Sequence, residues 1–462
     1  MLEGKNRSMF TYKVLVSVLC LIVLAAVGTG IFYVGNPPEI TIDPKMPVIG
    51  MKTPVRVEIS APRRGLTHVK IEIVQGDSSA LLLEKTYPSS SSIPFIGEGI
   101  YRDEALVEAG RQNFPELKGG SAVIRVTAGR AGTWLRSPDP VTDEITLPVQ
   151  LTPPSLQVTS IQTNVAQGGS EVVTYRVGET SVRDGVRAGS WWFPGFALPG
   201  GGPRDRFALF AIPHDMTGPE ARLTAEDAAG NVAERTFIDN FSPRMFRSDQ
   251  MGVSDAFLNK VVPEILSQSP EITEQGTLVD SYILINRELR RINDETLKNL
   301  SRNTSPSFLW TRNFIMMPNS KVTALFGDRR TYLYEEKEID HQVHLGIDLA
   351  SVRQAPIPAA NSGRVVYAGY LGIYGITVVI DHGYGLQTIY GHLSSVDAVE
   401  GQDVARGDII GRTGETGLAG GDHLHYGVLL HGLPVNPLEW SDGQWIRNRI
   451  GLKLGPSFVF IP

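Results

Sequence analysis

The chain has 462 residues, of which 42% are hydrophobic and 20% are charged, and these proportions exclude a mainly disordered protein. This length exceeds one ordinary hydrophobic core and predicts about three domains. The net charge of −6 gives no reason to expect a nucleic-acid partner, because nucleic acids select basic surfaces. The only cysteine is Cys20, so an internal disulfide is excluded.

A run of 21 residues without a charge, 14–34, follows the basic residues Lys5, Arg7 and Lys13. This length suffices for a membrane-spanning helix, and the preceding positive charges favour a cytoplasmic N-terminus. We therefore expect residues 1–36 to form a cytoplasmic tail and a transmembrane anchor, with a cleaved signal peptide as the alternative. In either case the rest of the chain lies outside the cytoplasm. We expect a single-pass protein of the inner (cytoplasmic) membrane with its bulk in the periplasm.

Residues 37–151 contain short runs in which apolar and polar residues alternate: VRVEIS (55–60), VKIEIV (69–74), AVIRVTA (122–128) and EITLPVQL (144–151). Alternation with a period of two predicts strands of a half-buried antiparallel sheet. Residues 152–243 repeat this pattern, and their DAAGN turn resembles the closing hairpin of bacterial immunoglobulin-like modules. We therefore predict two β-sandwich modules, one in each range.

Two adjacent tryptophans, Trp191 and Trp192, precede the glycine- and proline-rich loop 194–205. They allow two interpretations, a binding surface or core aromatics beside a flexible loop, and the second is the more common situation in proteins.

Residues 244–310 carry the signals of a helical linker. One apolar stripe with helical spacing runs through 277–300 and consists of Leu278, Tyr282, Ile285, Leu289 and Ile292. Thr277 with Asp280 predicts an N-terminal cap for this helix, and 254–268 predicts a shorter one. Because no residue here carries obvious chemistry, we expect a packing or spacer segment, with a lid over the next domain as the alternative.

Histidines are concentrated near the end of the chain, where seven of the nine lie between residues 341 and 431. In VHLGIDL (343–349), strict alternation predicts a strand with His344 and Asp348 on one face. In DHLHYGVLL (422–430), a strand would likewise place His423 and His425 on one face. If the two strands lie opposite each other, these four side chains converge.

Two imidazoles and one carboxylate would make three metal ligands and leave one tetrahedral position for water, as in catalytic zinc sites. A structural zinc site is closed by four ligands, generally with cysteine. A third run, TIYGHL, places His392 at the end of a strand, with Tyr390 two residues earlier on the same face. Water activated by zinc needs a base and a developing oxyanion needs a donor, and imidazole can serve in either role.

Three motifs occur in this order: HLGIDLA (344–350), IYGHLS (389–394) and GDHLHYGV (421–428). With their spacing, they make residues 311–440 resemble the zinc metallopeptidases of the lysostaphin/LytM type, peptidase family M23. The resemblance implies an antiparallel β-sheet groove in a domain at 311–462. It also implies that zinc is bound by His344, Asp348 and His425. His423 would then be the catalytic base, and His392 would stabilise the oxyanion.

The predicted protein is therefore a mainly β, multidomain, membrane-anchored zinc endopeptidase that cuts the peptide cross-links of bacterial peptidoglycan, with peptide stems as its substrate. Two alternatives stay open: a non-catalytic regulator or scaffold of cell-wall hydrolases, and a zinc peptidase that acts on envelope proteins. Arg329 or Arg330 could approach an acidic substrate, although a solvated pair is the simpler interpretation. The remaining histidines are expected to have no metal role, and these are His68, His214, His341, His382 and His431.

Overall fold

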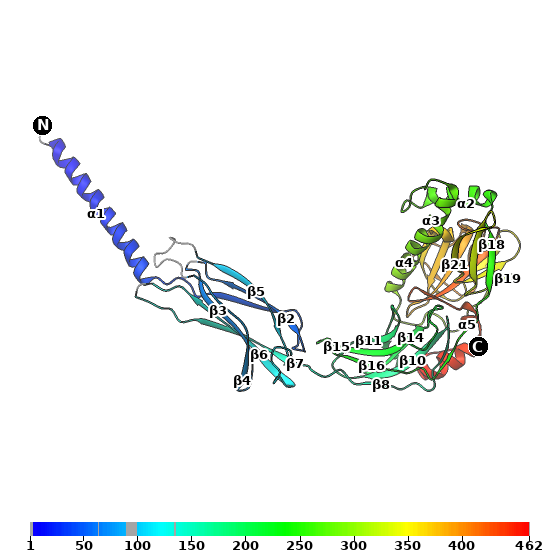
Figure 1. The fold of residues 1–462 in the computed structure, drawn as a ribbon, viewed down its shortest axis with the longest axis horizontal. Helices are drawn as coiled ribbons and strands as arrows, with labels where there is room; N and C mark the ends of the chain where they lie inside the picture. Colours follow the sequence, from blue (N-terminus) through cyan, green and yellow to red (C-terminus); the bar gives the residue numbers. More distant parts are fainter. Residues whose placement is uncertain (1–2, 63, 89–98, 134, 462) are drawn as a thin grey trace. The chain divides into compact units, whose positions relative to one another are not determined.

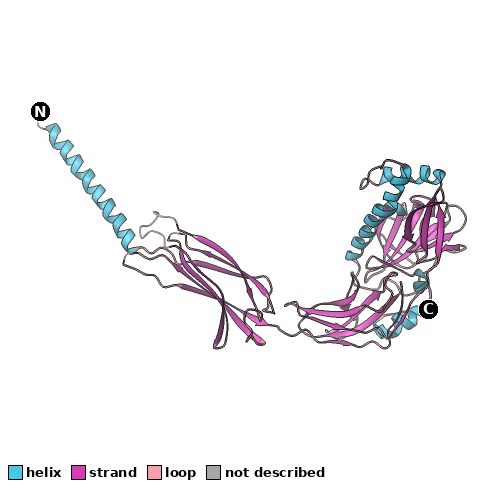
Figure 2. Cartoon of the chain, in the orientation of Figure 1, coloured by secondary structure: helices cyan, strands magenta, loops and turns pink. Residues whose placement is uncertain are grey.

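A computed structural model describes residues 3–62, 64–88, 99–133 and 135–461. Residues 1–2 of the predicted tail, residues 63, 89–98 and 134 of the predicted first module, and residue 462 lie outside the described residues. Strands predominate in the chain (Figure 2), and the prediction of a mainly β protein is confirmed. The chain divides into two compact units, Met1–Pro153 with Glu226–Val232, and Pro154–Ala225 with Ala233–Pro462.

The first unit begins with helix α1, Glu3–Phe32. Its residues Phe10–Gly28 form a stretch of 19 residues with a mean hydropathy of 2.4, which is long and apolar enough to cross a membrane. A single such helix fits a membrane anchor and equally a signal sequence. Its orientation in a membrane stays a prediction.

Two sheets that share one hydrophobic core follow α1 in the first unit. Their orders are β1-β2-β5 and β4-β3-β6-β7, and the four predicted runs lie in β2, β3, β6 and β7. The alternation in sequence matches the burial, since every second residue of β2 is buried. The strands are β1 Glu39–Pro44, β2 Thr53–Ser60, β3 Leu66–Gln75, β4 Ser78–Thr86, β5 Arg102–Ala109, β6 Gly120–Arg130 and β7 Val141–Val149.

The next β segment also forms two sheets, β13-β14-β10-β8 and β12-β11-β15-β16, and a short parallel pair joins β9 and β17. The immunoglobulin-like topology of both modules and the domain boundaries 37–151, 152–243, 244–310 and 311–462 stay predictions. The strands are β8 Leu156–Val158, β9 Asn164–Ala166, β10 Ser170–Val177, β11 Ser181–Ala188, β12 Trp191–Pro194, β13 Phe196–Ala197, β14 Asp205–Ala211, β15 Arg222–Asp227, β16 Val232–Arg235 and β17 Asn240–Ser242.

Helices occupy the predicted helical segment. α2, Asp255–Gln268, begins at its cap Ser254, and α3, Leu278–Leu284, begins at a capping box formed by Thr277 and Asp280. The chain continues through a π turn, Ile285–Leu289, into α4, Arg290–Leu300. Both predicted helices and the cap are confirmed. The spacing of the apolar residues did not predict the π turn.

The C-terminal strands form a ten-stranded sheet whose main path is β19-β22-β29-β26-β25-β24-β27, with β23, β28 and β30 paired beside it. A smaller sheet has the order β18-β20-β21. The strands are β18 Ser248–Gly252, β19 Lys321–Ala324, β20 Arg329–Tyr334, β21 Lys337–Val343, β22 Ile347–Ala350, β23 Pro356–Pro358, β24 Gly363–Tyr370, β25 Ile376–Asp381, β26 Leu386–Val396, β27 Asp403–Val404, β28 Ile409–Thr413, β29 Leu424–Leu430 and β30 Leu433–Val435.

Helices α2, α3 and α4 lie against one side of the C-terminal strands (Figure 1). Their apolar stripe shares a core with residues of the large sheet, among them Val379, Ile389 and Leu429. Short helices end the chain after β30: α5 Pro437–Ser441, α6 Gly443–Ile446 and α7 Leu452–Leu454.

The second β segment and the C-terminal sheet share one hydrophobic core. The ring of Phe207, on β14, lies with its centroid 4.9 Å from that of Tyr384 and 5.8 Å from that of Phe308. The buried carboxylate of Glu439, on α5, accepts a hydrogen bond from the main-chain N–H of Ser170 on β10 (2.8 Å). The C-terminal sheet therefore depends on residues far upstream for part of its burial.

We predict that a fragment of residues 311–462 is much less stable than one of residues 154–462, because it leaves the core around Tyr384 exposed. Its unfolding temperature, measured by circular dichroism, should be lower by about 10 °C or more. Equal unfolding temperatures for the two fragments would contradict the shared core.

We also predict a pH dependence that comes from Glu439. Burial raises the pKa of its carboxyl to about 7, above the ordinary value of 4.5. The stability that its proton provides is thus fully present below pH 4.5 and is lost as the pH rises through 7. Relative to Glu439→Gln, the free energy of unfolding of the wild type should fall by on the order of 2 kcal/mol across this window, measured by urea denaturation. Parallel pH profiles for the two proteins would refute this assignment.

Candidate metal centre and active site

Strand register brings the predicted site residues together. β22 pairs with β29 in antiparallel fashion, and Asp348 lies directly opposite His425. β26 pairs with the other edge of β29, where Gly391 lies opposite His425 and precedes His392. Three neighbouring strands of the large sheet therefore supply Asp348, His425 and His392 to one site.

His344 does not lie on the strand that its sequence pattern predicts. β21 ends at Val343 and β22 begins at Ile347, so the expected single strand 343–349 is wrong. The chain crosses here from the smaller sheet to the larger one, and His344 lies in the crossing. Its imidazole nevertheless reaches Asp348, because the short crossing keeps the two residues close.

Three acceptor atoms converge at one point. Nε2 of His344 lies 2.9 Å from Oδ1 of Asp348 and 3.1 Å from Nδ1 of His425, and the last two atoms lie 3.1 Å apart. In the described residues, this is the one group of three or more His, Cys, Asp or Glu side chains arranged to hold a metal ion. Tetrahedral zinc with bonds of about 2.0–2.2 Å separates its ligand atoms by about 3.3 Å, so the donor set and the spacing both fit zinc.

A hydrogen bond orients the ring of His344. Its Nδ1–H donates to the main-chain oxygen of Leu325 at 3.0 Å, which leaves a lone pair on Nε2 in the neutral ring. A lone pair that faces a carboxylate oxygen at 2.9 Å needs a cation between them, either a metal ion or a proton.

Asp348 also pairs with Arg330. Oδ2 accepts a hydrogen bond from the guanidinium of Arg330 at 3.0 Å, while Oδ1 faces the histidines. Burial alone would raise the pKa of Asp348, but the neighbouring imidazoles of His344 and His425 hold it well below its usual range. The carboxylate is therefore ionised and can bind a cation.

His425 is buried and packs against Gly346, where a Cβ would lie 2.5 Å from Cε1 of the imidazole. A side chain at position 346 would therefore displace the ring. Burial lowers the pKa of His425 to about 4, so that the ring is neutral at neutral pH. A neutral imidazole is the form that binds a metal.

His392 and His423 lie beside the three converging residues. Nδ1 of His392 donates to the main-chain oxygen of Thr416 at 2.8 Å, and Nδ1 of His423 donates to that of Gly421 at 2.7 Å. The two ring centroids are 4.9 Å apart, and Nε2 of His423 is 3.7 Å from Oδ1 of Asp348. Burial lowers the pKa of His392 well below its usual value, with a further contribution from the neighbouring charge on His423.

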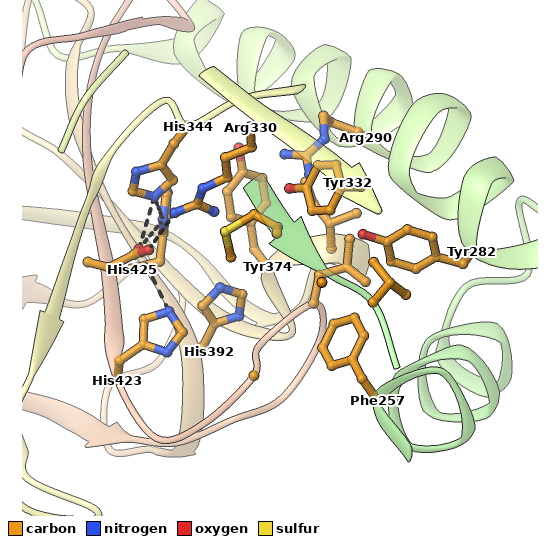
Figure 3. Close-up of a pocket in the computed structure, with 17 residues that line it drawn as sticks. Phe257, Tyr282, Arg290, Arg330, Tyr332, His344, Tyr374, His392, His423 and His425 are labelled. Atoms are coloured by element: carbon orange, nitrogen blue, oxygen red, sulfur yellow. Dashed lines mark hydrogen bonds and ion pairs between the residues drawn. The ribbon is translucent and has the colours of Figure 1, made fainter. Parts of the chain in front are cut away.

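These side chains line a cavity of about 260 Å³. Figure 3 shows His344, His425, His423 and His392 at one end, with Arg330 next to His344. The helical segment forms the far wall through Phe257, Tyr282 and Arg290, together with Met251–Val253 at and after the end of β18. The predicted linker thus lines the site itself.

Tyr390 and the remaining histidines lie outside the cavity. Because His392 has a φ of 64°, the strand alternation breaks there, and Tyr390 packs in the core against Tyr426. His382 is buried between Ser362 and Thr388, and His341 lies at the surface beside Glu338. His431 packs against Phe193. His68 contacts Thr67, and the main-chain oxygen of His214 accepts a hydrogen bond from Gln167.

Arg329 and Arg330 differ in their burial. Arg329 is exposed, whereas Arg330 is mostly buried against Asp348. Trp191 and Trp192 are each partly buried, with Lys298 and Arg183 above their respective rings.

The pattern of Peptidase family M23 matches residues 342–437. DD-carboxypeptidase/endopeptidase Mpg of Neisseria meningitidis is 41% identical over 98 residues, which is 21% of this chain and 23% of that protein. Peptidoglycan DD-endopeptidase ShyA of Vibrio cholerae is 34% identical over 119 residues, 26% of this chain and 27% of its own length. The chain thus spans about a quarter of the curated relatives that it matches.

The solved structures that resemble the chain include the catalytic domain of the antimicrobial peptidase lysostaphin from Staphylococcus simulans. It is 24% identical, with a TM-score of 0.24, and the match covers 27% of this chain and 94% of that domain. The family pattern includes β22, β26 and β29, which carry Asp348, His392 and His425, respectively. The C-terminal part of the chain, at residues 342–437, is therefore a domain of peptidase family M23.

Proposed function

We propose that the protein is a zinc-dependent endopeptidase that hydrolyses peptide cross-links of bacterial peptidoglycan. The observation that carries the proposal is the convergence of three acceptor atoms at the end of a cavity, within an M23 domain. The names of the two relatives support the substrate, because one is a DD-carboxypeptidase/endopeptidase and the other is a peptidoglycan DD-endopeptidase.

His344, Asp348 and His425 would hold the zinc ion, through Nε2, Oδ1 and Nδ1, respectively. A bound zinc would supply a Lewis acid for the scissile carbonyl and would make water more acidic. The hydrogen bond from His344 to Leu325 and the ion pair of Asp348 with Arg330 keep these ligands oriented.

His423 and His392 would move protons. Because Nδ1 of each ring donates to a main-chain oxygen, the neutral ring can accept a proton only at Nε2. His423, with Nε2 3.7 Å from the Asp348 carboxylate, is placed to act as the base. His392 can stabilise an oxyanion once it carries a proton at Nε2, since the imidazolium then donates from that atom.

The apolar helix α1 supports a position in the cell envelope, either as a single-pass anchor in the inner membrane or as a signal sequence. In the anchored form, the M23 domain would work in the periplasm and reach the wall from the membrane.

We predict that the two histidines of GDHLH have different roles. His425→Ala should lose most of its zinc, measured by elemental analysis of the purified protein, because it removes a ligand. His423→Ala should keep its zinc while turnover falls by about 10²- to 10⁴-fold, the usual contribution of a general base. Loss of zinc in His423→Ala would overturn this assignment.

We further predict that the full-length protein in detergent, loaded with zinc, releases cross-link fragments from isolated sacculi. His344→Ala should abolish this release, because the remaining two ligands bind zinc weakly. Chromatography and mass spectrometry of the soluble products measure the effect. Zinc binding without release would favour a non-catalytic regulator, and cleavage of an envelope protein alone would favour a protein substrate.

A further inference from the structure

One wall of the catalytic cavity comes from outside the region that matches the family. Phe257 and Tyr282, from α2 and α3, line the cavity together with Arg290, the first residue of α4. These residues precede the matched region 342–437. Any contact that these residues make with a substrate is therefore additional to the contacts made by the matched region.

Arg290 carries the one formal charge on this helical wall. Figure 3 shows its side chain extending from α4 toward Tyr332 and Arg330. In the part of the chain that the structure describes, no ion pair within 4 Å joins Arg290 to an acidic side chain, although Asp294 lies one helical turn further along α4. The positive charge of Arg290 is thus available to a ligand.

The π turn before α4 holds this arginine in place. The main-chain N–H of Arg290 bonds to the oxygens of Ile285 and Arg287 and bypasses that of Asn286. The Asn286 main-chain oxygen instead accepts the side-chain Nε–H of Arg290 at 3.1 Å, and its Oδ1 accepts Nη2–H at 2.6 Å. Asn286 is fully buried and donates from Nδ2 to Asp340 at 2.8 Å. The orientation of the guanidinium is therefore built into the fold.

Two acidic side chains outside the cavity lining lie near Arg290. Asp294, exposed on α4, interacts with it electrostatically without forming an ion pair, and Asp340 is already bonded to Asn286 and Arg287. Asp348 is the one acidic side chain in the cavity lining, and it is already paired with Arg330 and faces His344 and His425. The aromatic rings of Phe257 and Tyr282 line this end of the cavity and reduce its polarity, which strengthens the attraction between charges there. The cavity thus favours an anionic group at its helical wall.

We propose that Arg290 binds a carboxylate of the substrate, so that the enzyme selects cross-links that carry a free carboxylate near the scissile bond. This inference rests on the proposed function, because it names the class of cross-link that the same site accepts. A guanidinium whose Nε and Nη2 are held by Asn286 presents Nη1 to such a group in a fixed direction.

The test compares two synthetic cross-linked peptides that differ in one group. In one, the bridging diamino acid is diaminopimelate with a free carboxylate, and in the other that carboxylate is a carboxamide. The proteins are the zinc-loaded full chain in detergent, Arg290→Gln, Arg290→Lys and the control Arg291→Gln. Arg291 lies next to Arg290 on α4, but it is exposed and pairs with Glu288 and Glu295.

The wild type should prefer the carboxylate peptide in kcat/KM by about 10- to 100-fold, the usual effect of a hydrogen bond between charged groups. Arg290→Gln should lose this preference and cleave the carboxamide peptide as the wild type does. Arg290→Lys should keep part of the preference, and Arg291→Gln should keep all of it. An equal loss on both peptides in Arg290→Gln, or a gain on both, would overturn the proposal, because it would assign Arg290 to packing or to closure of the cavity.

A binding measurement separates this inference from the proposed function. If the zinc-loaded wild type cleaves neither peptide, the proposed function fails, and calorimetry of the same peptides still tests Arg290. A preference for the carboxylate that Arg290→Gln removes supports the inference, and equal affinities for both peptides in the wild type overturn it.

Discussion

Three electron-pair donors that face one another at about 3 Å form the constraint on which this site depends. Such atoms repel unless a cation lies among them, and the fold holds them there by strand pairing. Asp348 lies opposite His425 across β22 and β29, and the Leu325 carbonyl orients His344. A slip of one residue between these strands would turn one side chain to the other face of the sheet and open the site.

Local patterns predicted the parts of the fold that depend on local physics. The capping box at Thr277 and the strand runs of the first module follow from hydrogen bonding and burial within short segments. Alternation on paired strands predicted that His344, Asp348, His423 and His425 converge, and the M23 resemblance divided them into three ligands and a base. Alternation was wrong at His344, where the chain changes sheets, and at His392, where a positive φ reverses the face.

The features that the sequence could not predict depend on contacts between segments that are distant in the chain. The apolar stripe of 277–300 indicates neither the π turn nor the direction of the Arg290 side chain. Both depend on the contact of Asn286 with Asp340, which lies 54 positions further along the chain. The shared core of the second β segment and the C-terminal sheet has the same origin. The helical segment therefore lines the cavity, and its packing on the sheet belongs to the core of the second unit.

The most direct test of the account is the position of the metal itself. Anomalous X-ray diffraction at the zinc edge, from crystals of the zinc-loaded protein, should give one peak in the second unit, bonded to His344 Nε2, Asp348 Oδ1 and His425 Nδ1. His423 and His392 should lie outside bonding distance. A peak bonded to His423 in place of His425, or no peak among these side chains, would contradict the account.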